Sequence, residues 1–288
     1  MAKRLRIRTH AKVNLYLEIL GRRSDGYHDV DTVMQTVALS DEMELEERAS
    51  GSEVVCEMPG VPLNEQNLAV RAWRVFRERT GRPPGLKITL LKRIPVAAGL
   101  GGGSGNAAGV LAGLSEMYGE PDDLGALAAG VGSDVPFFLS GGTQRGMGRG
   151  TELTPLPALP ECWILLVCAE IQVSTRWAYE RVKMPLTTKQ DLITMIQSGL
   201  GHGDLSAVAR GLFNRFEPVI FETCPELGSL KSEILRCRAS GVVLSGSGPT
   251  LAAIFESRDA ALTLCARLAG RGYRCFVVEP AEKGIEIL

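Results

Sequence analysis

Glycines gather in one short stretch of this chain, PVAAGLGGGSGNAAGVLAGL, at residues 95–114. Several backbone N–H groups can point at one phosphate only where side chains leave room, and glycines followed at once by a helix provide that room. The N-terminus of the helix expected from about Ser104 adds positive potential. Ser104 itself could cap this helix or offer its hydroxyl to phosphate or magnesium. We therefore predict a phosphate-binding loop; the alternative is a flexible turn before a tightly packed Gly/Ala helix.

The loop matches none of three common nucleotide signatures. The chain has no Gly-Lys pair, so G-x-x-x-x-G-K-[ST] is absent, and the H-R-D of protein kinases is absent too. G-x-G-x-x-G fails at Ser104 when counted from Gly99 and at Asn106 when counted from Gly101. A dinucleotide-dependent oxidoreductase is thereby disfavoured, and a phosphate loop of another lineage is favoured.

Charged side chains that could complete an active site lie far from this loop in the sequence. Residues 11–20 alternate apolar and polar side chains, which predicts a half-buried strand with Lys12 and Asn14 on its polar face. A solvated edge-strand lysine is the alternative for Lys12. Asp134 stands directly before an apolar segment with Pro136, where it could cap a helix or act chemically.

The composition is typical of a globular enzyme without a highly charged partner. The 288 residues suit two domains or one large one, with 45% hydrophobic and 23% charged residues. A net charge of −1 provides no overall field toward nucleic acid or anionic lipid. The seven cysteines are scattered and never spaced C-x-x-C, and the three histidines are dispersed. We predict reduced thiols in a cytoplasmic protein, without a zinc site or a disulfide framework.

Neither a targeting segment nor a membrane span is expected. The basic N-terminus MAKRLRIRTH has no apolar run behind it, unlike a signal peptide. Residues 94–115 carry no charge, but seven glycines interrupt them and large apolar side chains are few.

Strands and helices are mixed without a steady βαβ rhythm, so we predict an α+β fold. Strands are expected at residues 11–20, 32–39, 42–47, 53–57, 86–91, 163–169, 242–244, 251–255 and 273–278, and helices at 67–80, 104–118, 122–131 and 260–269. The proline-rich segment 151–160 marks the expected boundary, which divides the chain into residues 1–155 and 156–288.

Three motifs together resemble one superfamily. P-x-x-x-G-L-G-G-G-S-x-N-A-A resembles the ATP loop of the galactokinase, homoserine kinase, mevalonate kinase and phosphomevalonate kinase (GHMP) superfamily. AKVNLYLEILGRRSDGYH at 11–28 and LSGSGPTLAAIF at 244–255 are similar to its other motifs, in the same order. With GSDVPFFL at 132–139, they resemble the branch that phosphorylates the 2-hydroxyl of 4-diphosphocytidyl-2-C-methyl-D-erythritol in non-mevalonate isoprenoid precursor synthesis.

The resemblance implies a two-domain kinase, with an N-terminal ATP-binding and catalytic domain and a C-terminal ferredoxin-like domain on the substrate side. ATP would be the phosphate donor, and Mg²⁺ would accompany its phosphates. The expected partner is a small-molecule substrate, without nucleic acid or membrane, and the expected state is a monomer or weak homodimer. Another GHMP-type kinase, mevalonate-like or homoserine, and a non-catalytic ATP-binding sensor are the alternatives. DGYH argues against the first, and the presence of both Lys12 and Asp134 against the second.

The resemblance also implies roles for matching residues. Lys12 and Asp134 correspond to the catalytic pair: the carboxylate can take or orient the acceptor's proton, and the lysine can keep it ionised and meet phosphoryl charge. The residues expected at ATP are Asn67, Leu68, Lys92, Pro95, Val96, Ala97, Ala98, Gly99, Leu100, Gly101, Gly102, Gly103, Ser104 and Gly105. The residues expected at the acceptor are Asn14, Tyr27, His28, Ser174 and Thr175. No side chain is assigned to a metal.

Some of these assignments have plain structural alternatives. Tyr27 could stack on cytosine and His28 could bond its edge, or both could belong to a surface turn. Ser174 and Thr175 begin an expected helix, so a simple N-cap explains them equally well. Most relatives carry a second serine where this chain has Gly105. Because the backbone N–H and Ser104 remain, we expect phosphate binding to persist with one hydroxyl fewer.

Overall fold

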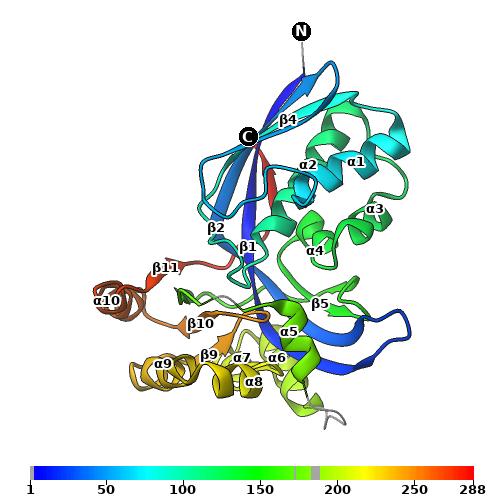
Figure 1. The fold of residues 1–288 in the computed structure, drawn as a ribbon. Coiled ribbons are helices and arrows are strands. Elements are labelled where there is room, and N and C mark those ends of the chain that lie inside the picture. Colours follow the sequence, from blue (N-terminus) through cyan, green and yellow to red (C-terminus); the bar gives the residue numbers. More distant parts are fainter. Residues whose placement is uncertain (1–2, 172, 183–188) are drawn as a thin grey trace.

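Two sheets, one mainly from each half of the chain, form the framework of the computed structural model, which describes residues 3–171, 173–182 and 189–288 (Figure 1). The larger sheet has the order β12-β1-β2-β4-β3, with β5 paired to β2, β6 paired to β5, and β8 paired to β1. Its strands are β1 (Arg4–Arg22), β2 (His28–Arg48), β3 (Gly51–Cys56), β4 (Gly85–Leu91), β5 (Thr143–Met147), β6 (Glu152–Pro155), β8 (Phe213–Asn214) and β12 (Ile285–Ile287).

Four helices pack beside the larger sheet, at the upper right of Figure 1: α1 (Leu68–Thr80), α2 (Gly102–Tyr118), α3 (Leu124–Val131) and α4 (Val135–Ser140). Helix α1 buries Trp73 and Phe76 in the core that these helices share with the sheet. Helix α2 consists mostly of small residues, which lets it approach β1 closely. A Cβ added at Gly109 would lie 2.6 Å from the Thr9 Cγ2 atom. The glycines of this helix therefore serve packing as well as the loop before it.

The C-terminal half contains the second sheet, in the order β11-β7-β10-β9, with every neighbouring pair antiparallel. Its strands are β7 (Trp163–Cys168), β9 (Gly241–Leu244), β10 (Thr250–Phe255) and β11 (Arg274–Val278). Its helices are α5 (Thr175–Arg181), α6 (Gln190–His202), α7 (Leu205–Gly211), α8 (Glu217–Thr223), α9 (Pro225–Arg236) and α10 (Arg258–Ala269). The first strand in sequence lies between the fourth and the third, which is the ferredoxin-like arrangement. The predicted α+β fold with this C-terminal domain is confirmed.

The strands of the larger sheet differ from the sequence prediction in length. The expected strands 32–39 and 42–47 form one continuous strand, β2, because the irregularity between them is a bulge: His10 pairs with Ser40, but Ala11 pairs with Val37. Strands β5 and β6 were not expected, since their sequences TQRGM and ELTP are short and polar. Helix α2 begins at Gly102 rather than at about Ser104.

Both ends of the described chain lie on the larger sheet. Strand β12 pairs with β1, where Ile7 faces Ile287, and β8 also pairs with β1. The division into residues 1–155 and 156–288 stays a prediction, and these pairings show that segments of the second part return to the first sheet. None of the helices in the described ranges is both long and apolar enough to span a bilayer.

A buried charge network joins the larger sheet to the glycine-rich loop. Asp41 on β2 is completely buried and forms an ion pair with Lys92, whose side chain is 4% exposed. The Asp41 Oδ1 atom accepts hydrogen bonds from the backbone N of Arg93 at 2.8 Å and of Ile94 at 2.9 Å. Asn106 on α2 donates to Asp41 at 3.1 Å and accepts from Lys92 at 3.1 Å. One carboxylate thus fixes the chain entering the loop and the helix leaving it.

The loop also depends on glycine where it crosses β1 and α4. Gly101 has φ 71°, in the left-handed region. A Cβ there would lie 2.7 Å from the Phe138 Cζ atom and 2.9 Å from the Lys12 Cγ atom. At Gly103, two residues on, an added Cβ would meet only the Leu68 Cδ1 atom, at 3.8 Å. Position 101 therefore excludes a side chain, whereas position 103 has room for one.

Asp41→Ala should lower the free energy of unfolding by ~3–5 kcal/mol, because it leaves the Lys92 ammonium buried without a counter-charge. Urea unfolding followed by circular dichroism measures the change. Glu46→Ala is the control: Glu46 pairs with Arg4 on the solvent side, and we expect a far smaller loss of stability. Similar losses in both variants would contradict a special role for the buried pair.

Gly101→Ala should destabilise the protein by ~1–3 kcal/mol, because the methyl group meets Phe138 and the backbone is left-handed. The matched variant Gly103→Ala should be neutral or stabilising by up to about 1 kcal/mol, since alanine favours a helix. The same urea experiment compares the two. If both variants lost equal stability, crowding at position 101 would not be the cause.

Candidate active site

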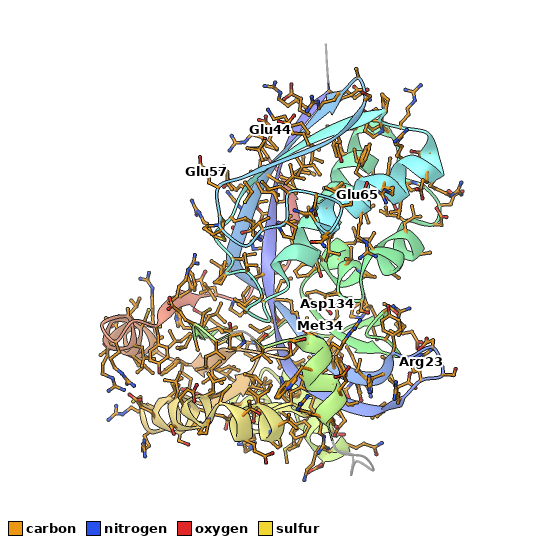
Figure 2. All side chains as sticks on the ribbon, in the orientation of Figure 1. Arg23, Met34, Glu44, Glu57, Glu65 and Asp134 are labelled. Atoms are coloured by element: carbon orange, nitrogen blue, oxygen red, sulfur yellow. The ribbon has the colours of Figure 1, made fainter. Side chains whose placement is uncertain are left out.

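A cavity of about 1010 Å³ lies between the two halves and is lined by residues from both. Figure 2 shows Asp134 near the middle of the molecule, above α5 in that view. Nine of the predicted site residues line the cavity: Lys12, Asn14, Tyr27, His28, Gly99, Gly101, Ser104, Asp134 and Thr175. Segments that are distant in sequence therefore meet around one space.

The Lys12 ammonium and the Asp134 carboxylate meet at one wall of this cavity. The Lys12 Nζ and Asp134 Oδ2 atoms are 3.3 Å apart; the Lys12 side chain is 5% exposed and that of Asp134 is 39% exposed. Lys12 also donates to the Asn14 Oδ1 atom at 2.6 Å, and Asn14 in turn donates to Thr32 at 2.9 Å. Asp134 directly precedes α4, but its side chain makes no capping hydrogen bond. The carboxylate is thus turned to Lys12 and the cavity instead of the helix.

The start of α2 reaches the same cavity through Gly101 and Ser104, and its first backbone amides have no side-chain cap. Gly101 is the N-cap, and it supplies no side-chain acceptor to the amides that follow. Such amides, together with the helix dipole, form an anion site. Ser104 lies within this first turn and lines the cavity, so it is not the N-cap that the sequence suggested. The loop is held on β1 because the Lys12 backbone N donates to the Leu100 carbonyl at 3.0 Å.

The third sequence motif supports the loop from the opposite side. The Ser245 hydroxyl donates to the Gly99 carbonyl at 2.9 Å and accepts from the Asn14 backbone N at 3.4 Å. Gly246 comes close as well, since a Cβ there would lie 3.4 Å from the Gly99 carbonyl oxygen. The C-terminal domain therefore contacts the loop and β1 at the same place.

An aromatic group forms the other end of the cavity, next to the β1–β2 hairpin whose outer part carries Arg23 (Figure 2). Tyr27 is half exposed, and its backbone N donates to the Asp25 carboxylate at 3.0 Å, which shapes the turn. The His28 ring stacks on Tyr179 with centroids 4.7 Å apart and an interplanar angle of 25°. Tyr179 in turn meets Phe216 edge-on at 4.8 Å. A flat ligand could thus find ring surfaces here.

Burial keeps the two stacked rings uncharged. Desolvation, and after it the positive charge of Arg22, holds the pKa of His28 below its usual value. Desolvation, and after it the negative charge of Asp134, raises the pKa of Tyr179 to about 12. Near neutral pH the His28 imidazole is therefore neutral, with one nitrogen able to accept a hydrogen bond and one able to donate.

Several predicted site residues do not line the cavity. Ser174 caps α5 by accepting from the Trp177 backbone N at 3.4 Å, and Asn67 caps α1 by accepting from Ala69 at 3.0 Å. Lys92 is held in the ion pair with Asp41. The other predicted ATP residues outside the lining are Leu68, Pro95, Val96, Ala97, Ala98, Leu100, Gly102, Gly103 and Gly105. Their contact with nucleotide stays a prediction.

The cavity also contains side chains that sequence reasoning missed. Arg22, Thr32, Arg149, Arg176, Tyr179 and Ser247 line it. Arg149 carried a signal, because it stands between two glycines in GMGRG. Nothing in the local sequence distinguishes Tyr179, which reaches the cavity only through the packing of α5.

Comparisons with known proteins agree with this architecture. The model of the GHMP kinases N terminal domain matches residues 67–142, and that of the GHMP kinases C terminal region matches residues 196–274. A 4-diphosphocytidyl-2-C-methyl-D-erythritol kinase of Acetivibrio thermocellus is 36% identical over 276 residues, which cover 95% of this chain and 98% of that protein.

Solved structures give the same result. A crystal structure of 4-(cytidine 5'-diphospho)-2C-methyl-D-erythritol kinase superposes with a TM-score of 0.81 at 32% identity, covering 96% of this chain and 99% of that one. A homoserine kinase from Cytophaga hutchinsonii reaches 0.80 at only 18% identity, covering 99% and 97%, and so shares the fold. Family models, relatives and structures together establish that the chain belongs to the GHMP kinases, which use ATP as phosphate donor, and that it is an ATP-dependent phosphotransferase.

Proposed function

We propose that this kinase transfers the γ-phosphate of ATP to the 2-hydroxyl of 4-diphosphocytidyl-2-C-methyl-D-erythritol. One observation carries the proposal: the Lys12 Nζ and Asp134 Oδ2 atoms lie 3.3 Å apart at the wall of one cavity. Residues of the glycine-rich loop, Tyr27 and His28 line the same cavity. The relatives named for this activity, similar over nearly the whole chain, support the same acceptor.

The glycine-rich loop is proposed to hold the phosphates of ATP. The amides at the start of α2 have no side-chain cap, so phosphate oxygens would be their acceptors. The absence of a side chain at Gly101 allows close approach of the anion, and the Ser104 hydroxyl faces the same space. The positions of Lys12 and the loop are linked, since the Lys12 backbone N bonds to Leu100.

Asp134 and Lys12 are proposed to prepare the acceptor oxygen. As that oxygen forms its bond to the γ-phosphorus, the bond from phosphorus to the bridging oxygen breaks and ADP leaves. The hydroxyl proton passes to the Asp134 carboxylate. Lys12 stabilises negative charge on the moving phosphoryl group and holds the carboxylate in place. Asn14 fixes the Lys12 ammonium through the 2.6 Å hydrogen bond.

The ring surfaces at the other end of the cavity are proposed to bind the cytosine base. Tyr27, half exposed, offers a face for stacking. The neutral His28 imidazole, supported by Tyr179, can accept a hydrogen from the amino group of the base. A homoserine or mevalonate acceptor would have no use for these rings, which favours the cytidine-bearing acceptor over other substrates of the superfamily.

Magnesium is proposed to arrive with ATP. Among the described residues there is no group of three or more acidic, histidine or cysteine side chains that could hold a metal. This suits Mg²⁺, which is usually held by substrate phosphates, water and one or two protein oxygens. Ser104 and Asp134 line the cavity and carry side-chain oxygen atoms that could join the coordination shell of the ion. When bound, the ion would neutralise charge on the β- and γ-phosphates.

A reducing compartment and a monomeric or weakly dimeric state are proposed as the setting of the reaction. All seven cysteines are free thiols, which supports a reducing compartment such as the cytoplasm. Because the cavity is lined by this single chain, a monomer or weak homodimer would suffice. Light scattering across a concentration series measures the oligomeric state.

A coupled assay of ADP release tests the acceptor, with the cytidylated methylerythritol compared with homoserine and mevalonate. Phosphorus NMR of the product identifies the hydroxyl that carries the new phosphate. Turnover of homoserine or mevalonate, with none of the cytidylated compound, would overturn the proposed acceptor.

Asp134→Asn should lower kcat by roughly 10²- to 10⁴-fold, because the amide cannot take the acceptor's proton. Binding of ATP, measured by calorimetry, should stay close to that of the unchanged chain, since the loop amides are intact. Undiminished turnover in the variant would remove Asp134 from the mechanism.

The acceptor's kcat/KM should stay level through neutral pH and fall only at a pH below the ordinary pKa of histidine. The lowered pKa of His28 keeps its ring neutral over this range, and protonation at lower pH removes the nitrogen that accepts from the base. A pH series of kcat/KM, which reports groups of the free enzyme, is the measurement. His28→Gln should lack the low-pH fall attributed to this ring; an identical fall in that variant would assign it to another group.

A further inference from the structure

Arg149 lies at the end of the cavity that Tyr27 and His28 line, on the turn between β5 and β6. Gly148 and Gly150 flank it with φ values of 62° and 86°, and the Gly148 carbonyl accepts from the Val30 backbone N at 2.8 Å. The turn is therefore attached to β2. The Arg149 guanidinium carbon lies 3.5 Å from the centre of the Tyr27 ring. The attachment of the turn to β2 and the contact with the Tyr27 ring thus hold the Arg149 side chain beside the expected position of the base.

The Arg149 guanidinium has a donor without an acceptor. Its Nε atom is buried and makes no hydrogen bond to any described residue. Arg145, on β5, offers a direct contrast, because its Nε and Nη2 atoms donate to Asp31 at 2.8 and 2.7 Å. Buried N–H groups in native proteins nearly always have an acceptor, since removing them from water without one is unfavourable. None of the Arg149 guanidinium nitrogens makes a hydrogen bond or an ion pair with a described residue, so a ligand in the cavity that Arg149 lines would supply the acceptors.

Positive charge is in excess at this end of the cavity. Arg22 and Arg176 also line the cavity, and within the described ranges the side chain of neither makes a hydrogen bond or an ion pair. Of the three acidic residues in the lining, Asp134 pairs with Lys12, and Asp25 shares Arg23 with Asp29. The three guanidinium groups outnumber the two carboxylates of Asp25 and Glu180, which favours an anionic ligand.

We propose that Arg149, together with Arg22 and Arg176 of the same cavity, binds the diphosphate of a nucleoside diphosphate whose base lies against Tyr27. The inference rests on the proposed function, in which the acceptor carries such a group. A guanidinium matches phosphate oxygens with paired donors, and a diphosphate follows directly after the base and ribose. Arg149 stacks on Tyr27 and not on the glycine-rich loop, so the acceptor's phosphates, rather than those of ATP, are its partner.

This arrangement makes the diphosphate a requirement for a good acceptor. An acceptor without it would leave the Arg149 guanidinium without a hydrogen-bond partner, and sites built to bond a polar group reject analogues that lack it. Arg149 would thus recognise the negative charge of the acceptor's diphosphate, while Tyr27 and His28 recognise the flat ring of its base.

Calorimetric titration of the full chain with cytidine 5'-diphosphate and with cytidine, both without ATP, separates charge recognition from ring positioning. For Arg149→Gln we expect the Kd of cytidine 5'-diphosphate to rise roughly 10- to 100-fold, with a far smaller change for cytidine. For Arg149→Lys the Kd of cytidine 5'-diphosphate should lie between the values of the unchanged chain and of Arg149→Gln, because lysine keeps the charge and loses the paired donors. Salt should weaken binding of the diphosphate more in the unchanged chain than in Arg149→Gln.

Arg77→Gln is the matched control, since Arg77 also lies over an aromatic ring, that of Trp73, outside the cavity. It should leave both affinities unchanged. Equal losses for cytidine and its diphosphate in Arg149→Gln would overturn the inference, because they would assign Arg149 to holding Tyr27 alone. Unchanged affinity for the diphosphate, or no binding of it by the unchanged chain, would overturn it too.

Steady-state kinetics separate this inference from the proposed function. Arg149→Gln should raise KM for the cytidylated acceptor and leave KM for ATP unchanged. If the unchanged chain phosphorylated that acceptor but Arg149→Gln did so with the same KM, the inference alone would fail. If the unchanged chain did not phosphorylate it, yet bound cytidine 5'-diphosphate through Arg149, the proposed function alone would fail.

Discussion

A lysine ammonium that is almost completely buried between the two domains determines how the site is built. The Lys12 side chain is 5% exposed, and a charge in such a place needs both an opposite charge and hydrogen-bond acceptors. Asp134 supplies the charge and Asn14 the acceptor. Because Asp134 directly precedes α4, meeting this requirement brings that helix to β1. Phe138 of α4 then occupies the space beside Gly101, which is why the loop cannot carry a side chain there.

The glycine-rich loop is held by hydrogen bonds from both domains. On one side Asp41 bonds to the backbone of Arg93 and Ile94, before the loop. On the other side Ser245, from the second domain, bonds to the Gly99 carbonyl. A site assembled in this way needs no large rearrangement of its backbone to bring the donor and acceptor sides together, since one hydroxyl contacts both the loop and β1.

Charge is distributed differently on the outer sheet and in the cavity. On the outer side of β1 and β2, arginines pair with glutamates across strands, as in Arg4–Glu46 and Arg8–Glu42. These exposed pairs contribute little to stability each, but they leave no excess of charge. In the cavity, by contrast, Arg149 has an unsatisfied donor. Paired arginines are typical of structural surfaces, and an unpaired one in a cavity is typical of a binding site.

The sequence by itself determined the family, the glycine-rich loop and the two catalytic candidates, because close backbone approach and phosphate binding require particular residue types at fixed spacing. Local patterns also predicted a helix at residues 67–80, within one residue of the bounds of α1. Only the tertiary structure decided that Asp134 turns to Lys12 instead of capping α4, and that Lys92 pairs with Asp41 away from the cavity. Strands β5 and β6, the turn that presents Arg149, and Tyr179 behind His28 were likewise beyond local reasoning. The physical reason is common to all of them: each side chain's partner comes from a distant segment, and spacing within one segment carries no information about which distant charge or ring will meet it.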